Sequence, residues 1–158
     1  MARERRLVGV LDNIRSLYNV CSMFRTADAF ALEHLYLCGM TGAPDDERRR
    51  SRITKTSLGA EETVPWTHVE RTGEAIAQLK HDGFTIVSLE QTSHAIPLTE
   101  LAVAGERIAL VVGHELYGVH ADTLSLADHH VMIPMLGAKE SLNVAVAFGI
   151  TTAWLRLT

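Results

Sequence analysis

Residues 108–119 read IALVVGHELYGV, and this stretch decides the fold. Ile108 to Val112 is the strongest buried-strand signal in the chain, because it is a short, uninterrupted and mostly β-branched apolar run. Gly113 ends the run, and Gly118 follows five residues later. Ligands of parallel α/β sheets bind at the carboxyl ends of strands, so Gly113 is expected to let a ligand approach the backbone here. The alternative is a tight turn that needs both glycines for itself.

Strand-like and helix-like segments alternate on both sides of this run. Strands are expected at 6–11, 34–38, 64–69, 84–89 and 131–133, and helices at 17–31, 53–62, 72–82, 124–127 and 140–157, with a loop at 39–52. Ser16 is the expected N-cap of the first helix, and Gly83 is expected to end the helix at 72–82. Such alternation predicts an α/β fold with a parallel sheet covered by helices on both faces, in a single domain over residues 1–158.

The segment 133–147, IPMLGAKESLNVAVA, leads from the last expected strand into the last helix. That helix is apolar nearly all round and must be covered on more than one side, which predicts a homodimer. Ser141 is its expected N-cap. Asn143 lies at the head of the same apolar helix, and an unpaired buried amide costs about 1–3 kcal/mol. We therefore expect Asn143 to find a partner in the backbone, in a ligand or in another subunit.

The composition is that of an average globular protein, with 47% hydrophobic and 22% charged residues in a chain of 158. The longest apolar run, Val144 to Ile150, is far shorter than the roughly 20 residues that cross a bilayer. The N-terminal residues show no secretory signal. Cys21 and Cys38 cannot build a disulfide framework. These features predict a protein of the reducing cytoplasm that makes no membrane contact.

Common nucleotide-binding and metal-binding motifs are absent from the sequence. No two of the eleven glycines lie two residues apart, which excludes a G-x-G-x-x-G turn. Gly113 and Gly118 have P-loop spacing, but Val119 and His120 follow where Lys and Ser or Thr are required. His114 and Glu115 begin like a zinc-protease helix, but a glycine stands where the second histidine belongs. An unrelated α/β enzyme with a nucleotide cofactor is therefore disfavoured, and no metal site is expected.

Positive charge is concentrated in the first third of the chain. The formal net charge is −4 overall, but it is +3 over residues 1–55 and −7 over residues 56–158. The segment 48–55, RRRSRITK, carries five of these positive charges in an expected loop. It predicts a local surface for a polyanion, and the alternative is a solvated charged loop.

The segment 19–30, NVCSMFRTADAF, completes the set of unusual stretches. It places Arg25 and Asp28 on an otherwise apolar helix, at a spacing that allows them to pair.

Together, 19–30, 113–118 and 133–144 resemble the three signature motifs of the SpoU (TrmH-like) family of RNA ribose methyltransferases, in the SPOUT class. The matching residues are Asn19, Arg25, Thr26 and Ala27; Gly113, Glu115 and Gly118; and Ile133, Pro134, Met135, Ser141, Leu142, Asn143 and Val144. Residues 55–66 and 89–98 also resemble the family, whereas Cys21 and Ala145 depart from its usual glycine and serine.

The resemblance implies an S-adenosylmethionine-dependent enzyme that methylates a ribose 2′-hydroxyl of tRNA or rRNA. It also implies a C-terminal deep trefoil knot and an obligate homodimer whose subunits share the site. By position, the cofactor-binding residues would be Leu89, Gly113, Ile133, Ser141 and Leu142, and the catalytic residues Asn19, Arg25, Glu115, Ser141 and Asn143. No appended RNA-binding domain is expected, so RNA would be bound by Arg48, Arg49, Arg50, Arg52 and Lys55. The alternative is a non-catalytic RNA-binding paralogue with the same fold.

Two roles are open for Arg25 in such an enzyme. In one, its guanidinium assists deprotonation of the ribose hydroxyl, although a permanently charged guanidinium is a poor base. In the other, it binds the adjacent phosphate and stabilises the developing alkoxide, aligned by Glu115.

Overall fold

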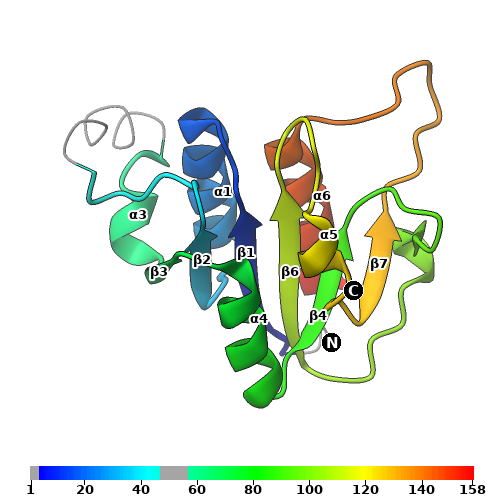
Figure 1. Ribbon diagram of the computed structural model, residues 1–158, viewed down its shortest axis with the longest axis horizontal. Coiled ribbons are helices and arrows are strands. Elements are labelled where there is room, and N and C mark those ends of the chain that lie inside the picture. Colours follow the sequence, from blue (N-terminus) through cyan, green and yellow to red (C-terminus); the bar gives the residue numbers. More distant parts are fainter. Residues whose placement is uncertain (1–3, 47–56) are drawn as a thin grey trace.

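The computed structural model describes residues 4–46 and 57–158. Over these residues the chain forms a seven-stranded sheet in the order β3-β2-β1-β6-β4-β7-β5, and every pairing is parallel (Figure 1). The strands are β1 (Arg6–Asp12), β2 (His34–Cys38), β3 (Trp66–Val69), β4 (Thr85–Leu89), β5 (Ile96–Pro97), β6 (Arg107–Gly113) and β7 (His129–Met132). The run that predicted a buried strand is β6, which lies between β1 and β4 in the middle of the sheet.

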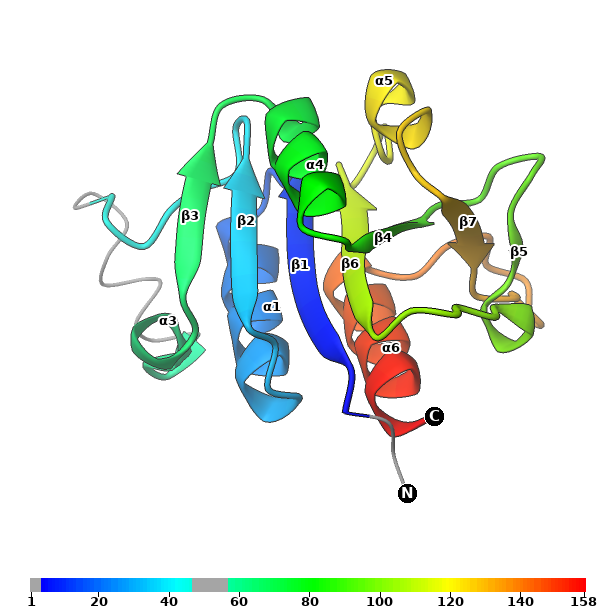
Figure 2. The same ribbon diagram turned by 90° about the horizontal axis from the view of Figure 1, so that it is seen from below.

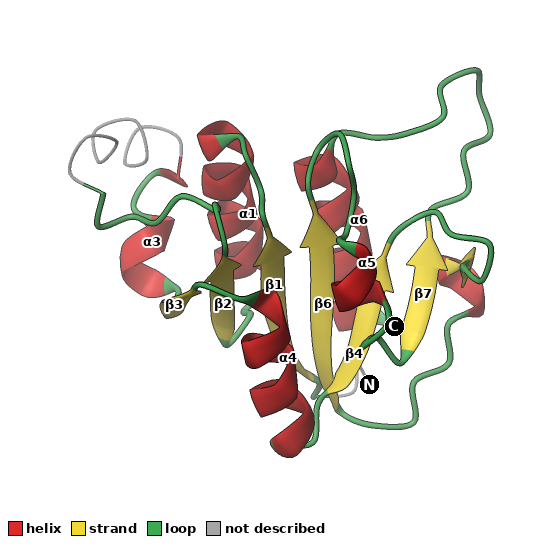
Figure 3. Cartoon of the chain, viewed as in Figure 1, coloured by secondary structure: helices red, strands yellow, loops and turns green. Residues whose placement is uncertain are grey.

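Helices cover both faces of this sheet, as predicted (Figure 2). On one face lie α1 (Leu17–Ala29) and α6 (Val144–Leu157), which pack against each other, with α3 (Ala60–Thr63) beside α1. On the other face lie α4 (Thr72–His81) and the short α5 (Ala121–Leu124). A 3₁₀ turn, Leu98–Glu100, follows β5. Figure 3 shows which segments of the chain are helices, strands and loops.

The core consists of two apolar layers, one on each side of the sheet. Phe24 of α1 and Phe148 of α6 are fully buried in the first layer. Ile76 and Leu79 of α4 are buried in the second. Strands β1 and β6 are buried along almost their whole length because both layers cover them. This burial on both sides explains the continuous apolar runs in their sequences.

Several element boundaries differ from the sequence-based expectations. The last helix begins at Val144 and not at residue 140, and α5 covers 121–124 in place of 124–127. The two-residue β5 was not predicted, since the residues of an edge strand this short form no recognisable pattern. The helix expected at 53–62 lies partly outside the described residues, and within them α3 begins only at Ala60 and ends at Thr63. Two helix-end predictions are confirmed: Ser16 Oγ accepts a hydrogen bond from Asn19 N, and Gly83 follows α4 with a φ of +82°.

Candidate functional site

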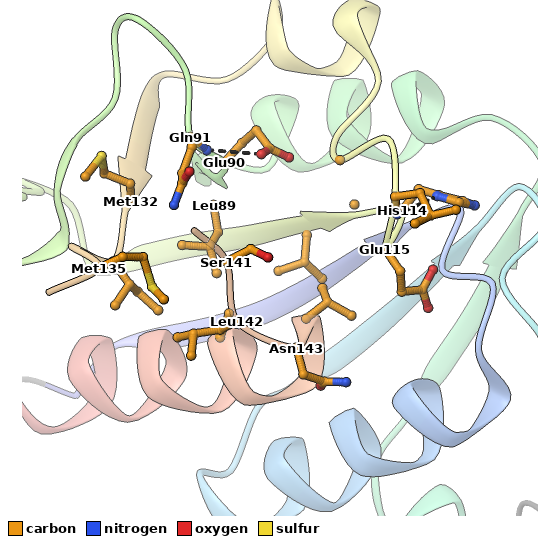
Figure 4. A pocket seen from close by; sticks show the side chains of 17 residues that line it. Leu89, Glu90, Gln91, His114, Glu115, Met132, Met135, Ser141, Leu142 and Asn143 are labelled. Atoms are coloured by element: carbon orange, nitrogen blue, oxygen red, sulfur yellow. Dashed lines mark hydrogen bonds between the residues drawn. The ribbon is translucent and has the colours of Figure 1, made fainter. Parts of the chain in front are cut away.

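A pocket of ≈ 330 Å³ lies at the carboxyl edge of the sheet, where the segments after β4, β6 and β7 meet (Figure 4). Its volume is within the range of small-molecule sites. Its lining residues are Leu89, Glu90, Gln91, Val112, Gly113, His114, Glu115, Leu116, Gly118, Met132, Ile133, Met135, Ser141, Leu142, Asn143, Val144 and Ala147. They include all five residues expected to bind a cofactor. The structure therefore brings together side chains that are far apart in the sequence.

The turn over residues 113–118 leaves no room for a side chain at either of its glycines. His114 N donates to Gly118 O at 3.0 Å, and Gly118 N donates to His114 O at 2.8 Å. A Cβ on Gly113 would lie 2.2 Å from Val119 N, and one on Gly118 would lie 2.1 Å from Glu90 Oε2. The space beside Gly113 is therefore filled by protein. The tight-turn interpretation is therefore confirmed, and Gly113 also lines the pocket, so the expectation that a ligand approaches its backbone stays a prediction.

Glu115 fastens this turn to the start of α1. Its carboxylate accepts hydrogen bonds from Ser16 N at 2.9 Å, from Arg15 N at 3.0 Å and from Asn19 Nδ2 at 3.0 Å. Desolvation of the carboxylate raises the pKa of Glu115, but these hydrogen bonds outweigh it and hold its pKa below the ordinary value. Glu115 is therefore an ionised acceptor at neutral pH.

Asn143 connects the same network to α6. Its Nδ2 donates to Asn19 Oδ1 at 3.1 Å, and its Oδ1 accepts from Ala145 N at 2.8 Å and from Val146 N at 3.3 Å. Asn143 is thus the N-cap of α6, and the expectation that Ser141 would cap it is wrong. The backbone at Asn143 is still non-helical (φ −52°, ψ 136°), so Ser141 lies too early in the chain to reach the first turn.

The Glu115–Asn19–Asn143 network joins the three segments that the sequence singled out. Asn19 is buried and bonded to both of its neighbours, while Glu115 and Asn143 border the pocket. A further hydrogen bond, from Gln91 Nε2 to Glu140 O at 2.9 Å, ties the segment after β4 to the one before α6. The network and this contact hold the walls of the pocket in place.

Arg25 does not line this pocket. It is exposed on α1, six residues beyond Asn19, which is about 9 Å along a helix axis. It does not pair with Asp28, whose Oδ1 instead accepts a hydrogen bond from Thr63 Oγ1 at 2.7 Å. Cys21, on the same helix, is buried, and burial raises the pKa of its thiol to about 11, so it packs as a neutral side chain.

Sequence reasoning missed several pocket residues, among them Glu90 and Gln91. Both directly follow the strand predicted at 84–89, so the argument from strand ends that selected Gly113 also applies to them. Glu90 holds the neighbouring turn, since its Oε2 accepts a hydrogen bond from Val119 N at 2.9 Å.

The residues expected to bind RNA lie outside the described part of the chain. They are Arg48, Arg49, Arg50, Arg52 and Lys55.

Two negative findings apply to the part of the chain that the structure describes. There, no three His, Cys, Asp or Glu side chains gather as ligands for a metal ion. Nor does any helix in that part have both the length and the apolar character needed to span a membrane.

Comparison with known proteins gives a family match over most of the chain. Residues 6–153 match the model of the SpoU rRNA Methylase family. A curated relative from Aquifex aeolicus, named tRNA (guanosine(18)-2'-O)-methyltransferase, is 30% identical over 94% of this chain and 67% of its own length. Among the curated relatives with the strongest matches, the chain covers from 49% to 67% of their length. It thus spans about half to two thirds of these proteins.

Solved structures share the fold. The A. aeolicus TrmH/SpoU tRNA modifying enzyme superposes with a TM-score of 0.83 at 28% identity, over 98% of this chain and 76% of that one. The SpoU methyltransferase AviRb from Streptomyces viridochromogenes, solved in complex with the cofactor AdoMet, has a TM-score of 0.83 over 97% of this chain and 60% of that one. At 24% identity, the latter likeness concerns the fold alone.

Proposed function

This chain belongs to the SpoU rRNA methylase family, and we propose that it transfers the methyl group of S-adenosylmethionine to a ribose 2′-hydroxyl of tRNA or rRNA in the cytoplasm. The observation that carries the proposal is the hydrogen-bonded network of Glu115, Asn19 and Asn143 at the border of the pocket. It joins the three motif segments in one place, with the five expected cofactor residues beside it.

The pocket fits this cofactor in shape and charge. Leucine, methionine, valine and isoleucine side chains form its apolar walls, which suit an adenine ring. Its charged lining residues are the carboxylates Glu90 and Glu115, and no lysine or arginine is among the described residues that line it. Such a lining favours a cationic sulfonium and disfavours the phosphates of a nucleotide cofactor.

In the reaction, the bound cofactor would supply an electrophilic methyl group, and the protein would orient the reacting groups. Leu89, Gly113, Ile133, Ser141 and Leu142 would hold the cofactor. Glu115 and Asn19 would keep the start of α1 fixed against the pocket. Arg25 would stabilise negative charge on the ribose oxygen or on a neighbouring phosphate, because a permanently charged guanidinium suits that role better than proton removal.

We propose that the working protein is a homodimer in which Arg25 of the partner subunit reaches the pocket. Arg25 does not line its own pocket, and it shares one face of α1 with Tyr18, which is 68% exposed. Val146 and Ile150, one turn apart on the neighbouring α6, are 50% and 43% exposed. These apolar side chains on adjoining helices form a surface that a second copy would cover.

We also propose that the C-terminal region forms a deep trefoil knot, as the family resemblance implies. The meeting of the segments after β4, β6 and β7 around one pocket supports it, as does the contact between Gln91 and Glu140. An experimental structure in which residues 133–143 pass outside the other two segments would contradict the knot.

Two variants test the function and the shared site together. Arg25→Ala should lower methyl transfer by about 10²–10³ while leaving S-adenosylmethionine binding nearly intact. Leu142→Arg places a charge in the apolar pocket and should abolish cofactor binding. Calorimetry measures binding, and tritiated methyl transfer to total RNA measures activity. The product should resist alkaline cleavage, because a methylated 2′-oxygen cannot attack its phosphate.

Co-expression of the two variants supplies the decisive control. In a mixed dimer, one subunit keeps an intact pocket and its partner keeps Arg25, so transfer should return if Arg25 acts across the interface. Inactive mixed dimers would place Arg25 in its own subunit's site. Cofactor binding without any transfer by the wild type would favour the non-catalytic paralogue.

A further inference from the structure

The turn after β6 presents a stacked pair of aromatic rings that the proposed methyl transfer leaves without a role. The rings of His114 and Tyr117 lie 4.8 Å apart between centroids, with an interplanar angle of 26°. One face of Tyr117 rests on His114, yet the residue is 84% exposed. The neighbouring Leu116 is 75% exposed. A large apolar surface therefore faces outward beside the pocket.

This pair is held rigidly. His114 Nδ1 accepts hydrogen bonds from Leu116 N at 3.0 Å and from Tyr117 N at 3.3 Å, which fixes the imidazole against the backbone that carries Tyr117. The turn itself is closed by the backbone bonds between His114 and Gly118. A ring that is already ordered loses little freedom when a second ring stacks on its open face. The rings are therefore prepared for a planar ligand.

The position of the pair indicates what that ligand is. His114 and Leu116 line the pocket, and Figure 4 shows His114 and Glu115 together at one end of it. Glu115 also accepts a hydrogen bond from the backbone of Arg15, which brings an exposed arginine to the same end. The Arg15 side chain makes no hydrogen bond or ion pair with any residue that the structure describes. Exposed aromatic rings and arginine side chains are the groups that bind single-stranded nucleic acid.

We propose that the open face of Tyr117 is a stacking platform for a base of the RNA substrate, next to the nucleotide whose ribose enters the pocket. This inference rests on the proposed function and adds to it a side chain that contacts the RNA. Every base has a π face, so stacking on Tyr117 contributes affinity and positioning without reading the sequence. A second copy of this chain is the competing occupant of the surface.

The test compares two oligomers that have the same phosphates. Fluorescence anisotropy measures binding of a short labelled oligoadenylate and of an abasic analogue of equal length to the full chain. Tyr117→Ala should weaken oligoadenylate binding about tenfold, since stacking is worth about 1–3 kcal/mol per base, and should leave binding of the abasic oligomer unchanged. Tyr117→Trp should restore the oligoadenylate affinity. His81→Ala removes an exposed ring from the far end of α4 and should change neither affinity.

The remaining outcomes each decide against the proposal. Equal losses on both oligomers would mean that Tyr117 acts through the backbone or the fold, and unchanged oligoadenylate binding would exclude stacking. Dissociation of a Tyr117→Ala dimer in sedimentation velocity would assign the surface to a second copy. Wild-type protein that binds the abasic oligomer as tightly as oligoadenylate would also overturn the proposal.

These measurements need no cofactor, so they separate the platform from the proposed function. A wild type that neither binds S-adenosylmethionine nor transfers methyl groups contradicts the function and leaves the stacking result to be judged by itself. A wild type that methylates RNA, with a Tyr117→Ala variant of unchanged affinity, contradicts the platform alone. In an active enzyme, Tyr117→Ala should raise KM for RNA more than it lowers kcat.

Discussion

Two carboxylates lie at neighbouring strand ends in this protein, and they have different surroundings. Asp12 ends β1 and pairs in register with Gly113, which ends β6, and Glu115 follows two residues later. Each accepts three hydrogen bonds. The Asp12 carboxylate accepts them from Thr72 Oγ1 at 2.5 Å, His120 N at 3.0 Å and Asn13 Nδ2 at 3.2 Å. The Glu115 carboxylate accepts them from Arg15 N, Ser16 N and Asn19 Nδ2. Asp12 is 1% exposed, whereas Glu115 is exposed and borders the pocket.

The difference shows how one edge of a sheet is divided between scaffold and site. Asp12 joins β1 to the starts of α4 and α5, on the face away from the pocket, and no solvent can replace it. Glu115 joins β6 to α1 on the pocket side, where water reaches its carboxylate. Loss of Asp12 should therefore appear in stability, and loss of Glu115 in activity.

The largest effect is expected at Asp12. Asp12→Ala leaves the Thr72 hydroxyl and the His120 amide without their acceptor, and should lower the free energy of unfolding by about 3 kcal/mol. Urea denaturation followed by circular dichroism measures this loss. Asp45→Ala, at an exposed loop position, is the control and should change the free energy by less than about 0.5 kcal/mol. A loss at Asp12 no larger than this would remove the distinction between the two carboxylates.

A smaller free-energy effect, of a different kind, is expected at Glu115. Glu115→Ala should lower methyl transfer about 10²-fold, because the first turn of α1 is no longer held against the pocket. Its unfolding free energy should fall by no more than about 1 kcal/mol, since water replaces the lost acceptor. Glu115→Gln keeps an acceptor and should recover part of the activity. The comparison fails if Glu115→Ala unfolds as readily as Asp12→Ala.

The smallest effect is a pH dependence specific to Glu115. Its pKa is lowered in the folded protein, so its contribution to stability is fully present above the unfolded value near 4.5 and is lost as pH falls through the folded pKa. The stability difference between wild type and Glu115→Gln should therefore shrink on acidification below about pH 4.5. Urea titrations at a series of acidic pH values measure it, and Glu100→Gln on the exposed 3₁₀ turn is the control. If the stability difference between wild type and Glu115→Gln grows on acidification, the pKa of Glu115 is not lowered in the folded protein.

Much of the fold could be read from local patterns, because they reflect which faces of each element are buried. The run from Ile108 to Val112 predicted the central strand, and the alternation of strands and helices predicted the parallel sheet with both faces covered. Ser16 could be recognised as an N-cap since its partner, Asn19 N, is only three residues away. The five expected cofactor residues were found through their motifs, and the structure places all of them around one pocket.

The tertiary structure alone decided the contacts between distant residues. The partner of Asn143 is Asn19, 124 residues earlier, and no local pattern carries such a pairing. The same contact, with the backbone bonds to Ala145 and Val146, made Asn143 and not Ser141 the cap of α6. Only the fold showed that Arg25 does not line its own pocket and that the turn leaves no room for a side chain at Gly113. The sequence determined which segments carry the chemistry, since composition and spacing are local, and the packing of those segments determined how their side chains meet.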